Sequence, residues 1–425
     1  MCAFLELVGP AKGRLEIATS GLVRIKGRLE PLELNQQEIA FRALDNFRIE
    51  IPSWGFANTG TRFGKFAQPA AACTIEEKFA DAAEVNRLTG ATPTLALHVL
   101  WDLPNGLSDV PEVKQLEKRF GIRSGSISPN LFEDQEYKFG SLCNPSAAIR
   151  EQALEHLLAS IEIAKALDAR DVSLWMADGS NYPGTQSMRK RIGWLEQALR
   201  IAHGHLAPHQ RLLVEYKPFE PAFYHTDIAD WGMASHLARD AGPQARVLVD
   251  TGHHYNAQNI EQIVAWLLHT AMLGGFHFND RRYADDDLTL GSIDPYQIFR
   301  IFHEIHCAQF DGLHDDIAFM IDQSHNLKGK IEAMIQTVMT AQELFLKAAL
   351  VDRNKLAELQ QACELVAAEE LYRGAFWCDV RPFTRAWREA RGLPADPLEA
   401  LRSSGYVERV THERVNRSLA VSSYA

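Results

Sequence analysis

Carboxylate and imidazole side chains follow several short apolar runs in the second half of the chain. Each run is too short for a helix and leads into residues that can bind a metal ion or move a proton. These residues are Glu215 in VEYKPFE, Asp250 and His253 in VDTGHH, His277 in FHFND, Asp285 and Asp287 in ADDDL, and Asp322 in MIDQSHN. If the runs are neighbouring parallel strands, these side chains meet at the edge where the strands end.

A ring of like charges at that edge would repel itself unless cations neutralised it. Carboxylate and imidazole ligands without thiolates favour Mn2+, Mg2+ or Co2+ over structural zinc. More than four candidate ligands indicate two metal ions that share one carboxylate. Each residue also has a simpler explanation, because residues 285–287 can form a solvated acidic loop and His277 can be a core histidine. The recurrence of such residues at one end of successive strands favours the metal site.

Lys217 lies two residues after Glu215 and therefore on the same face of an extended strand. The two residues either belong to the site or form an ion pair at the strand end. Aromatic rings follow other apolar runs and can wall a sugar pocket by packing on C–H faces. Each tryptophan among them can equally belong to the hydrophobic core. The rings are those of Trp54, His98, Trp101 and Trp175.

Eight apolar runs between Ile49 and Asn326 are expected to be strands. They begin at Ile49, Pro93, Gly121, Asp171, Arg211, Ala245, Gly274 and Ile317. Between them, apolar residues recur at three- and four-residue steps, which predicts helices. Strand and helix alternating eight times predicts parallel strands joined by right-handed crossovers, as in a (β/α)8 barrel. No glycine-rich phosphate loop follows the first strand, which disfavours a dinucleotide-binding sheet.

The barrel pattern leaves a segment at each end of the chain. We expect an N-terminal helical extension over residues 1–48, a barrel catalytic domain over residues 49–350, and a C-terminal helical extension and tail over residues 351–425. In the front segment, an apolar period around Ile39–Phe47 predicts one helix. The back segment is expected to be helical from Lys355 to about Leu393.

Composition narrows the range of partners and compartments. The formal net charge of -11 disfavours nucleic acid and anionic membranes as partners. The six cysteines are scattered without a CxxC pair, which argues against a disulfide framework and a thiolate zinc site. No secretory signal and no apolar run long enough to span a bilayer are evident. We therefore expect a soluble cytoplasmic protein.

Several motifs resemble those of the bacterial L-rhamnose isomerases, most closely the broad-specificity type that also converts D-allose. They are IPSWG, TGTRFGKF, ATPTLALHVLWD, WMADGSNYPG, EYKPFEPAFY, LVDTGHH, GGFHFND, ADDDL and MIDQSHN. The similarity extends from about Ile51 to Met334. It implies an α/β (β/α)8 barrel of the xylose isomerase-like type with helical N- and C-terminal extensions. It also implies a homotetramer with two divalent ions per subunit, most often Mn2+, with Mg2+, Co2+ or Zn2+ as alternatives.

Carried over to this sequence, the resemblance implies two ligand sets that share Glu215. The set of a structural metal ion is Glu215, Asp250, His277 and Asp322. The set around a catalytic metal ion is Glu215, His253, Asp285 and Asp287. Lys217, His98 and Trp175 correspond to residues that contact substrate, and Trp54 of IPSWG is expected to join them in the pocket wall.

Two stretches depart from that family. The segment NDRRY (Asn279–Tyr283) stands where NDSKY is common, a change that could alter the pocket rim or the subunit contacts. The first fifty residues resemble the family poorly, so their packing is not predicted.

The residues and the resemblance together predict a metal-dependent aldose–ketose isomerase that interconverts L-rhamnose and L-rhamnulose, and D-allose and D-psicose. We expect a hydride to cross between C1 and C2 while Asp322 assists proton transfer and Lys217 stabilises developing negative charge. Proton abstraction to an enediol is the competing route. The rival functions are a sugar epimerase on the same barrel, a metal-dependent endonuclease and a catalytically silent sugar-binding protein. The acidic net charge disfavours the endonuclease, and the complete ligand set disfavours the silent protein.

Overall fold

Eight parallel strands form the centre of the molecule and neighbour one another in sequence order. They are β3 (Ile51–Pro52), β4 (Thr94–His98), β5 (Arg123–Ser128), β6 (Asp171–Leu174), β7 (Arg211–Glu215), β10 (Ala245–Asp250), β11 (Leu273–Phe278) and β12 (Ala318–Ile321). The structure is a computed structural model, which describes residues 22–25, 28–31, 36–58, 66–220, 224–283, 285–313, 316–324 and 327–420.

The sheet closes on itself between its last and first strands. Glu50, just before β3, donates its backbone N–H to the carbonyl of Phe319 over 2.8 Å and accepts from the N–H of Ile321 over 2.9 Å. The same residue forms a parallel bridge with Met320. Every barrel strand therefore has a neighbour on each side, and the predicted (β/α)8 barrel is confirmed.

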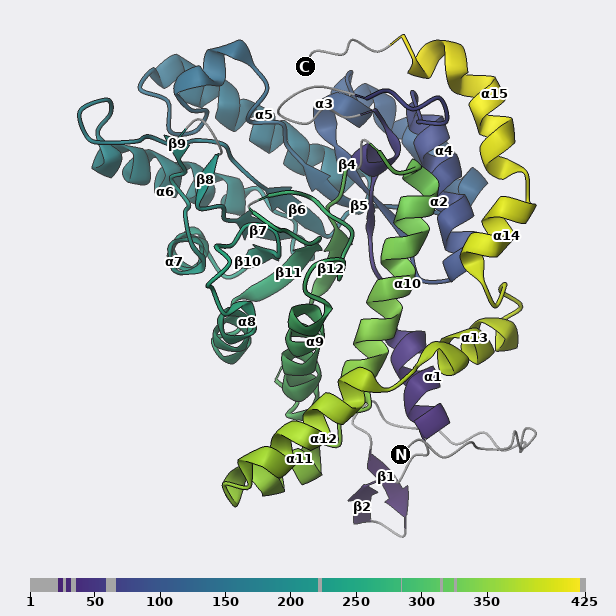
Figure 1. Ribbon diagram of the computed structural model, residues 1–425. Helices are drawn as coiled ribbons and strands as arrows, with labels where there is room; N and C mark the ends of the chain where they lie inside the picture. Colours follow the sequence, from purple (N-terminus) through teal and green to yellow (C-terminus); the bar gives the residue numbers. More distant parts are fainter. Residues whose placement is uncertain are drawn as a thin grey trace.

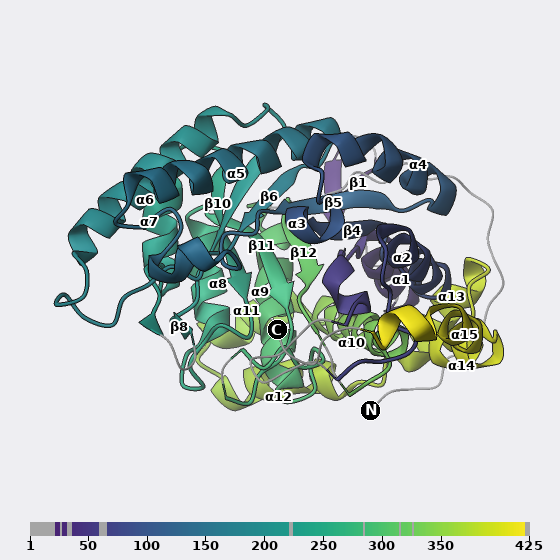
Figure 2. The same cartoon turned by 90° about the horizontal axis from the view of Figure 1, so that it is seen from above.

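Helices surround the strands, as the view in Figure 2 shows. Those of the barrel are α2 (Ile75–Thr89), α4 (Val110–Phe120), α5 (Ala147–Ala166), α6 (Met188–Gly204), α7 (Trp231–Ala241), α8 (Ile260–His269), α9 (Pro295–Phe310) and α10 (Lys330–Ala349), with a short α3 (Val99–Asp102) before α4. Side-chain caps fix where several of them begin. Thr74 and Glu77 form a capping box at α2, and Asp230 caps α7. Such caps satisfy backbone N–H groups that the helix itself leaves unpaired.

A small apolar cluster of Leu213, Leu248 and Met320, packed against Ala318, lies apart from the main hydrophobic core. Leu213, Leu248 and Met320 lie two residues before Glu215, Asp250 and Asp322. Side chains two apart on a strand share a face, so an apolar layer lies directly beneath the polar ends of these strands.

Further helices extend the barrel at both ends of the chain. They are α1 (Gln36–Asn46), α11 (Arg353–Gln361), α12 (Leu365–Trp377), α13 (Arg381–Ala390), α14 (Pro397–Ser403) and α15 (Tyr406–Ser418). In Figure 1, α13–α15 run along the side of the barrel formed by α1, α2 and α10. The sequence pattern predicts helices in the tail as far as about Leu393. However, Asp396 caps α14, and Leu401 and Val410 are buried in the common core.

Two small antiparallel pairs and several loops complete the described chain. β1 (Leu22–Ile25) pairs with β2 (Arg28–Pro31), so the front segment contains a hairpin as well as a helix, and β8 (Phe219–Glu220) pairs with β9 (Tyr224–His225).

The motif TGTRFGKF, over residues 59–66, falls almost wholly outside the described residues. Within the described part, the cysteines form no disulfide, and no helix is long and apolar enough to cross a membrane.

Candidate metal centre

The carboxyl ends of four neighbouring strands bring the predicted ligands together. Glu215 ends β7, Asp250 ends β10, His277 lies on β11, and Asp322 follows β12. Ligand atoms of Glu215, Asp250 and His277 all lie within 4.8 Å of one another, and all three residues are buried. Nδ1 of His277 lies 3.2 Å from Oε2 of Glu215 and 3.6 Å from Oδ2 of Asp322. The structure thus assembles the first predicted ligand set at one mouth of the barrel.

Glu215 also faces the second predicted set. Its Oε1 lies 3.2 Å from Nδ1 of His253, while Nε2 of His253 lies 2.9 Å from Oδ1 of Asp285. Asp287 lies in the same loop as Asp285, close enough that the negative charges of Asp285 and Asp322 act on its carboxyl. Glu215 therefore faces both predicted ligand sets, as a carboxylate shared by two metal ions would.

The neighbouring histidine lies elsewhere. Nε2 of His254 is 2.7 Å from the hydroxyl of Tyr216, and its ring is buried. The two residues lie in the turn that follows β10, where the N–H of His253 donates to the carbonyl of Asp250 over 3.2 Å, and only His253 of this pair faces the carboxylates.

The carboxyl groups in this cluster act on one another through their charges. Burial raises the pKa of Asp250 to about 7, and the charges of Glu215 and Asp322 act in the same direction. Burial also raises the pKa of Glu215, but the nearby His277 and His253 outweigh it and bring the value to about 2. Buried carboxylates and imidazoles without a thiolate fit Mn2+, Mg2+ or Co2+. A divalent cation would relieve the repulsion between the carboxylates.

The loop that carries the two remaining carboxylates has an unusual backbone. Asp285 and Asp287 have φ angles of 52° and 48°, in the left-handed region that few residues other than glycine adopt. The N–H of Asp285 is tied to the carbonyl of Gly252 over 3.2 Å. Such strain concentrates at functional sites, where the surrounding structure enforces it.

Aromatic rings line the side of the mouth next to the cluster. The ring centroids of Trp54 and His98 are 4.8 Å apart, and those of His98 and Trp101 are 4.2 Å apart. Phe132 continues this wall to Trp175, with centroids 4.8 Å apart. The predicted residues therefore come together. Phe132 was not predicted, since it lies in a loop whose path the strand pattern does not determine.

Lys217 joins the aromatic wall to the carboxylate cluster. Its Nζ lies 5.1 Å from the centre of the Trp175 ring, 2.5 Å from Oδ2 of Asp285 and 2.8 Å from Oε2 of Glu220. Burial lowers its pKa, yet these two carboxylates raise it overall. Lys217 is thus a buried cation at the junction of both halves of the site.

Two residues that support the ligands were not predicted from the sequence. The amide of Asn279 donates to Oδ1 of Asp250 over 3.0 Å and also faces Oδ2 at 3.2 Å. Arg281, in the departing NDRRY segment, is buried rather than at the pocket rim, and it bonds the loop that carries His253. Arg282, the other residue that departs, is exposed, so the departure affects the interior and the surface alike.

A second group of potential ligands has a different structural role. Atoms of Cys143, Asp178 and Asp227 come within 4.8 Å of one another. Arg191 donates to both carboxylate oxygens of Asp227 over 3.0 and 3.1 Å, and Asp178 accepts from the N–H and hydroxyl of Ser141. This group is therefore neutralised by protein donors.

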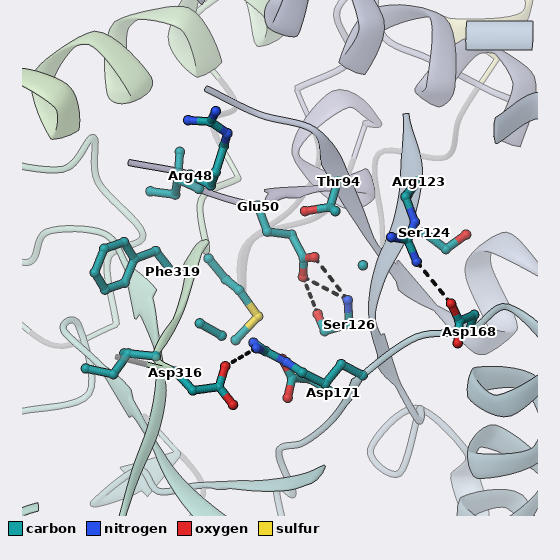
Figure 3. Close-up of a pocket in the computed structure, with 16 residues that line it drawn as sticks. Arg48, Glu50, Thr94, Arg123, Ser124, Ser126, Asp168, Asp171, Asp316 and Phe319 are labelled. Carbon is teal, nitrogen blue, oxygen red and sulfur yellow. Dashed lines mark hydrogen bonds and ion pairs between the residues drawn. The ribbon is translucent and has the colours of Figure 1, made fainter. Parts of the chain in front are cut away.

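A separate cavity lies at the opposite end of the barrel. It measures about 370 Å3, and its lining comes from the amino-terminal ends of the strands, including Glu50, Thr94 and Asp171. Figure 3 shows Glu50 directed at Ser126 and the ion pair of Arg123 with Asp168. Arg170 forms a second ion pair, with Asp316. The charges of this cavity are largely paired, and it is remote from the ligand cluster. In these barrels that face serves stability rather than catalysis.

Comparison with known proteins agrees with this architecture. A family model described as a xylose isomerase-like TIM barrel matches residues 94–313, and the chain belongs to that family. It is 38% identical over 391 residues to a probable sugar isomerase of Mesorhizobium japonicum, covering 90% of each chain. It is 39% identical over 374 residues to another of Rhizobium meliloti, covering 87% of this chain and 86% of that one. Among solved structures, an L-ribulose 3-epimerase shares the fold with a TM-score of 0.52 at 15% identity, covering 75% of this chain and 98% of the epimerase.

Proposed function

We propose that this protein is a metal-dependent aldose–ketose isomerase that interconverts L-rhamnose and L-rhamnulose, and also D-allose and D-psicose. The observation that carries the proposal is the double cluster around Glu215, beside an aromatic wall in the same barrel mouth. Two ions that share a carboxylate suit a reaction in which a carbonyl and its neighbouring hydroxyl change places.

The relatives support the class of reaction. Both curated relatives that align over most of the chain are named as probable sugar isomerases. The choice of L-rhamnose rests on the motifs quoted from the sequence, as do Mn2+ as the metal and a homotetramer as the assembly. Unbridged cysteines in the described chain are consistent with a reducing cytoplasm.

Glu215, Asp250, His277 and Asp322 would hold one divalent ion, and Glu215, His253, Asp285 and Asp287 the other. When bound, these ions would supply Lewis-acid polarisation of the sugar oxygens. The chain's own groups would then do three things. Trp54, His98 and Trp175 pack on the C–H faces of the open-chain sugar. Asp322 takes the proton from O2 of the aldose and returns it to O1 as a hydride crosses from C2 to C1. Lys217 stabilises the developing negative charge.

A sugar epimerase on the same barrel is the second candidate. The fold similarity to an L-ribulose 3-epimerase is compatible with an epimerase, although fold alone does not determine chemistry. Epimerisation needs acid and base groups on both faces of one carbon. The larger ligand set favours the isomerase.

The test is turnover of L-rhamnose by metal-stripped protein before and after Mn2+ is added, with D-allose, L-mannose and D-xylose alongside. We expect ketose formation only with metal and fastest from L-rhamnose. An Asp322→Asn variant should lose turnover. Ketose formed without metal, or no ketose from any aldose, would contradict the proposal. If ketoses are epimerised instead, the second candidate is correct.

Running the reaction in deuterated water separates the two routes. A hydride shift keeps the transferred hydrogen from exchanging with solvent, so C1 of the product should carry little deuterium. Extensive labelling at C1 would establish the enediol route. Light scattering on the same preparation tests the homotetramer.

A further inference from the structure

Arg281 lies just after β11 and is buried beneath the mouth of the barrel, with 7% of its surface exposed. Its guanidinium makes four hydrogen bonds. Nε donates to the carbonyl of His254 over 2.6 Å, and Nη1 donates to the carbonyl of Thr251 over 2.9 Å. Nη2 donates to the carbonyl of Tyr255 over 3.2 Å, and Nη1 also reaches Oε1 of Gln297 at 3.2 Å.

The three backbone carbonyls belong to one short loop, between β10 and α8. That loop carries His253, whose two ring nitrogens face Glu215 at 3.2 Å and Asp285 at 2.9 Å. A guanidinium has five donors in a rigid planar fork, so it can hold several carbonyls in one fixed arrangement. Arg281 therefore fixes the backbone on both sides of His253.

Arg281 itself lies in a second loop, which is held in place by hydrogen bonds of the neighbouring Asp280. Asp280 and Leu288 exchange backbone hydrogen bonds of 2.9 Å in both directions. The carboxyl of Asp280 also accepts from the N–H groups of Ile293 and Asp294 over 2.8 and 3.0 Å. This loop carries Asp285 and Asp287. Arg281 thus ties together the two loops that supply His253 and these two carboxylates.

The other ligand set is braced by different groups. Asp250 accepts from the N–H of Gly252 over 2.6 Å and from the amide of Asn279. Asp322 accepts from the indole of Trp54 over 2.9 Å. Within the described chain, none of the hydrogen bonds of Arg281 goes to Asp250, His277 or Asp322. The hydrogen bonds of Arg281 therefore hold the loops of one half of the centre, while its charge also acts on Asp250 of the other half.

We propose that Arg281 is a positioning residue for the second ligand set: it holds His253 in place relative to Asp285 and Asp287, so that this half of the centre is preformed. The proposal rests on the two-metal centre of the proposed function. Its consequence is selective, because loss of the guanidinium should weaken the binding of one divalent ion and leave the other nearly unchanged. Residues that orient ligands in this way typically change metal affinity by about 10–100-fold.

The test is titration calorimetry of metal-stripped, full-length protein with Mn2+ alone, without sugar. The wild type should show two sites. The Arg281→Ser variant should retain one site of wild-type affinity and bind the second ion about 10–100-fold more weakly. The Arg281→Lys variant, which keeps a cation but only a point-like donor group, should lie between them. Arg282→Ser is the matched control, since Arg282 is adjacent and exposed, and it should bind as the wild type does.

Four outcomes would overturn the proposal: an unchanged second site in Arg281→Ser, equal weakening of both sites, the same loss in Arg282→Ser, or fewer than two sites in the wild type. If Arg281→Ser does not fold, as judged by circular dichroism, Arg281→Lys decides alone. Failure of the proposed sugar chemistry is a separate result. A wild type that binds two ions but converts no aldose would contradict the isomerase and leave the role of Arg281 standing.

Discussion

Trp54 donates its indole N–H to Oδ1 of Asp322 over 2.9 Å, so the aromatic wall and the ligand cluster are joined by a direct hydrogen bond. Trp54→Phe removes this donor and keeps most of the apolar ring. Because the bond orients a carboxylate of the proposed first ligand set, we expect turnover of L-rhamnose and affinity for Mn2+ to fall about tenfold or more. Steady-state kinetics at several Mn2+ concentrations would measure both effects.

The matched control for this variant is Trp101→Phe. Trp101 also donates its indole N–H to a carboxylate, that of Glu133, over 2.7 Å. It lies at the rim of the mouth with 37% of its surface exposed and makes no bond to the cluster. Trp101→Phe should leave metal affinity unchanged and raise the KM through lost wall contacts. Equal effects of the two substitutions on Mn2+ affinity would refute an orienting role for Trp54.

Glu215 is the residue shared by both proposed ligand sets, with Oε1 facing His253 and Oε2 facing His277. Glu215→Gln should therefore lower the affinity for both ions and reduce turnover more than about 100-fold. His253→Gln should weaken the binding of only one ion, because His253 contacts one side of Glu215. Metal content after dialysis, measured by mass spectrometry, distinguishes these cases. Retention of both ions by Glu215→Gln would show that the carboxylate does not bridge them.

The convergence of Glu215, Asp250 and His277 could be predicted from sequence because of strand geometry. Residues two apart on a strand share a face, and parallel strands of a barrel all end at the same mouth. An apolar run ending in a carboxylate or an imidazole therefore determines where that side chain goes. His253 and His254 lie beyond the end of β10, in a turn, and there the ring of His254 contacts Tyr216 instead.

Loop paths and distant packing could not be predicted in this way. Phe132 and Arg281 reach the site from loops whose course depends on tertiary contacts, and no period in the sequence encodes those contacts. The helices after Leu393 likewise depend on contacts with residues far away in the sequence. Arg414 of α15 forms a buried ion pair with Asp81 of α2 over 2.7 Å. Such a contact, more than 300 residues apart in the chain, is invisible to local patterns.

Arg191 is expected to be a major contributor to stability. It is fully buried and donates to Asp227 and to the carbonyls of Phe139 and Cys143 over 3.0 Å each. Arg191→Leu leaves buried acceptors without a donor, which should cost on the order of 3–5 kcal/mol and lower the thermal unfolding midpoint. Arg200→Leu, which breaks the exposed pair with Asp240, should change the midpoint little. Similar midpoints for the two variants would contradict this role.

Glu50 should make stability depend on pH. Its carboxyl occupies the space left by Gly125, where a Cβ would lie 1.5 Å from Oε2, and burial raises its pKa above the ordinary value of 4.5, although hydrogen bonds from Ser126 lower it in part. A raised folded-state pKa means that folding takes up a proton, so this contribution to stability is lost as pH rises above 4.5. Glu50→Gln does not titrate, so its unfolding midpoint relative to wild type should rise between pH 5 and 8. Glu151→Gln, on an exposed part of α5, is the control. A midpoint difference that stays constant with pH would show that Glu50 is already ionised throughout this range.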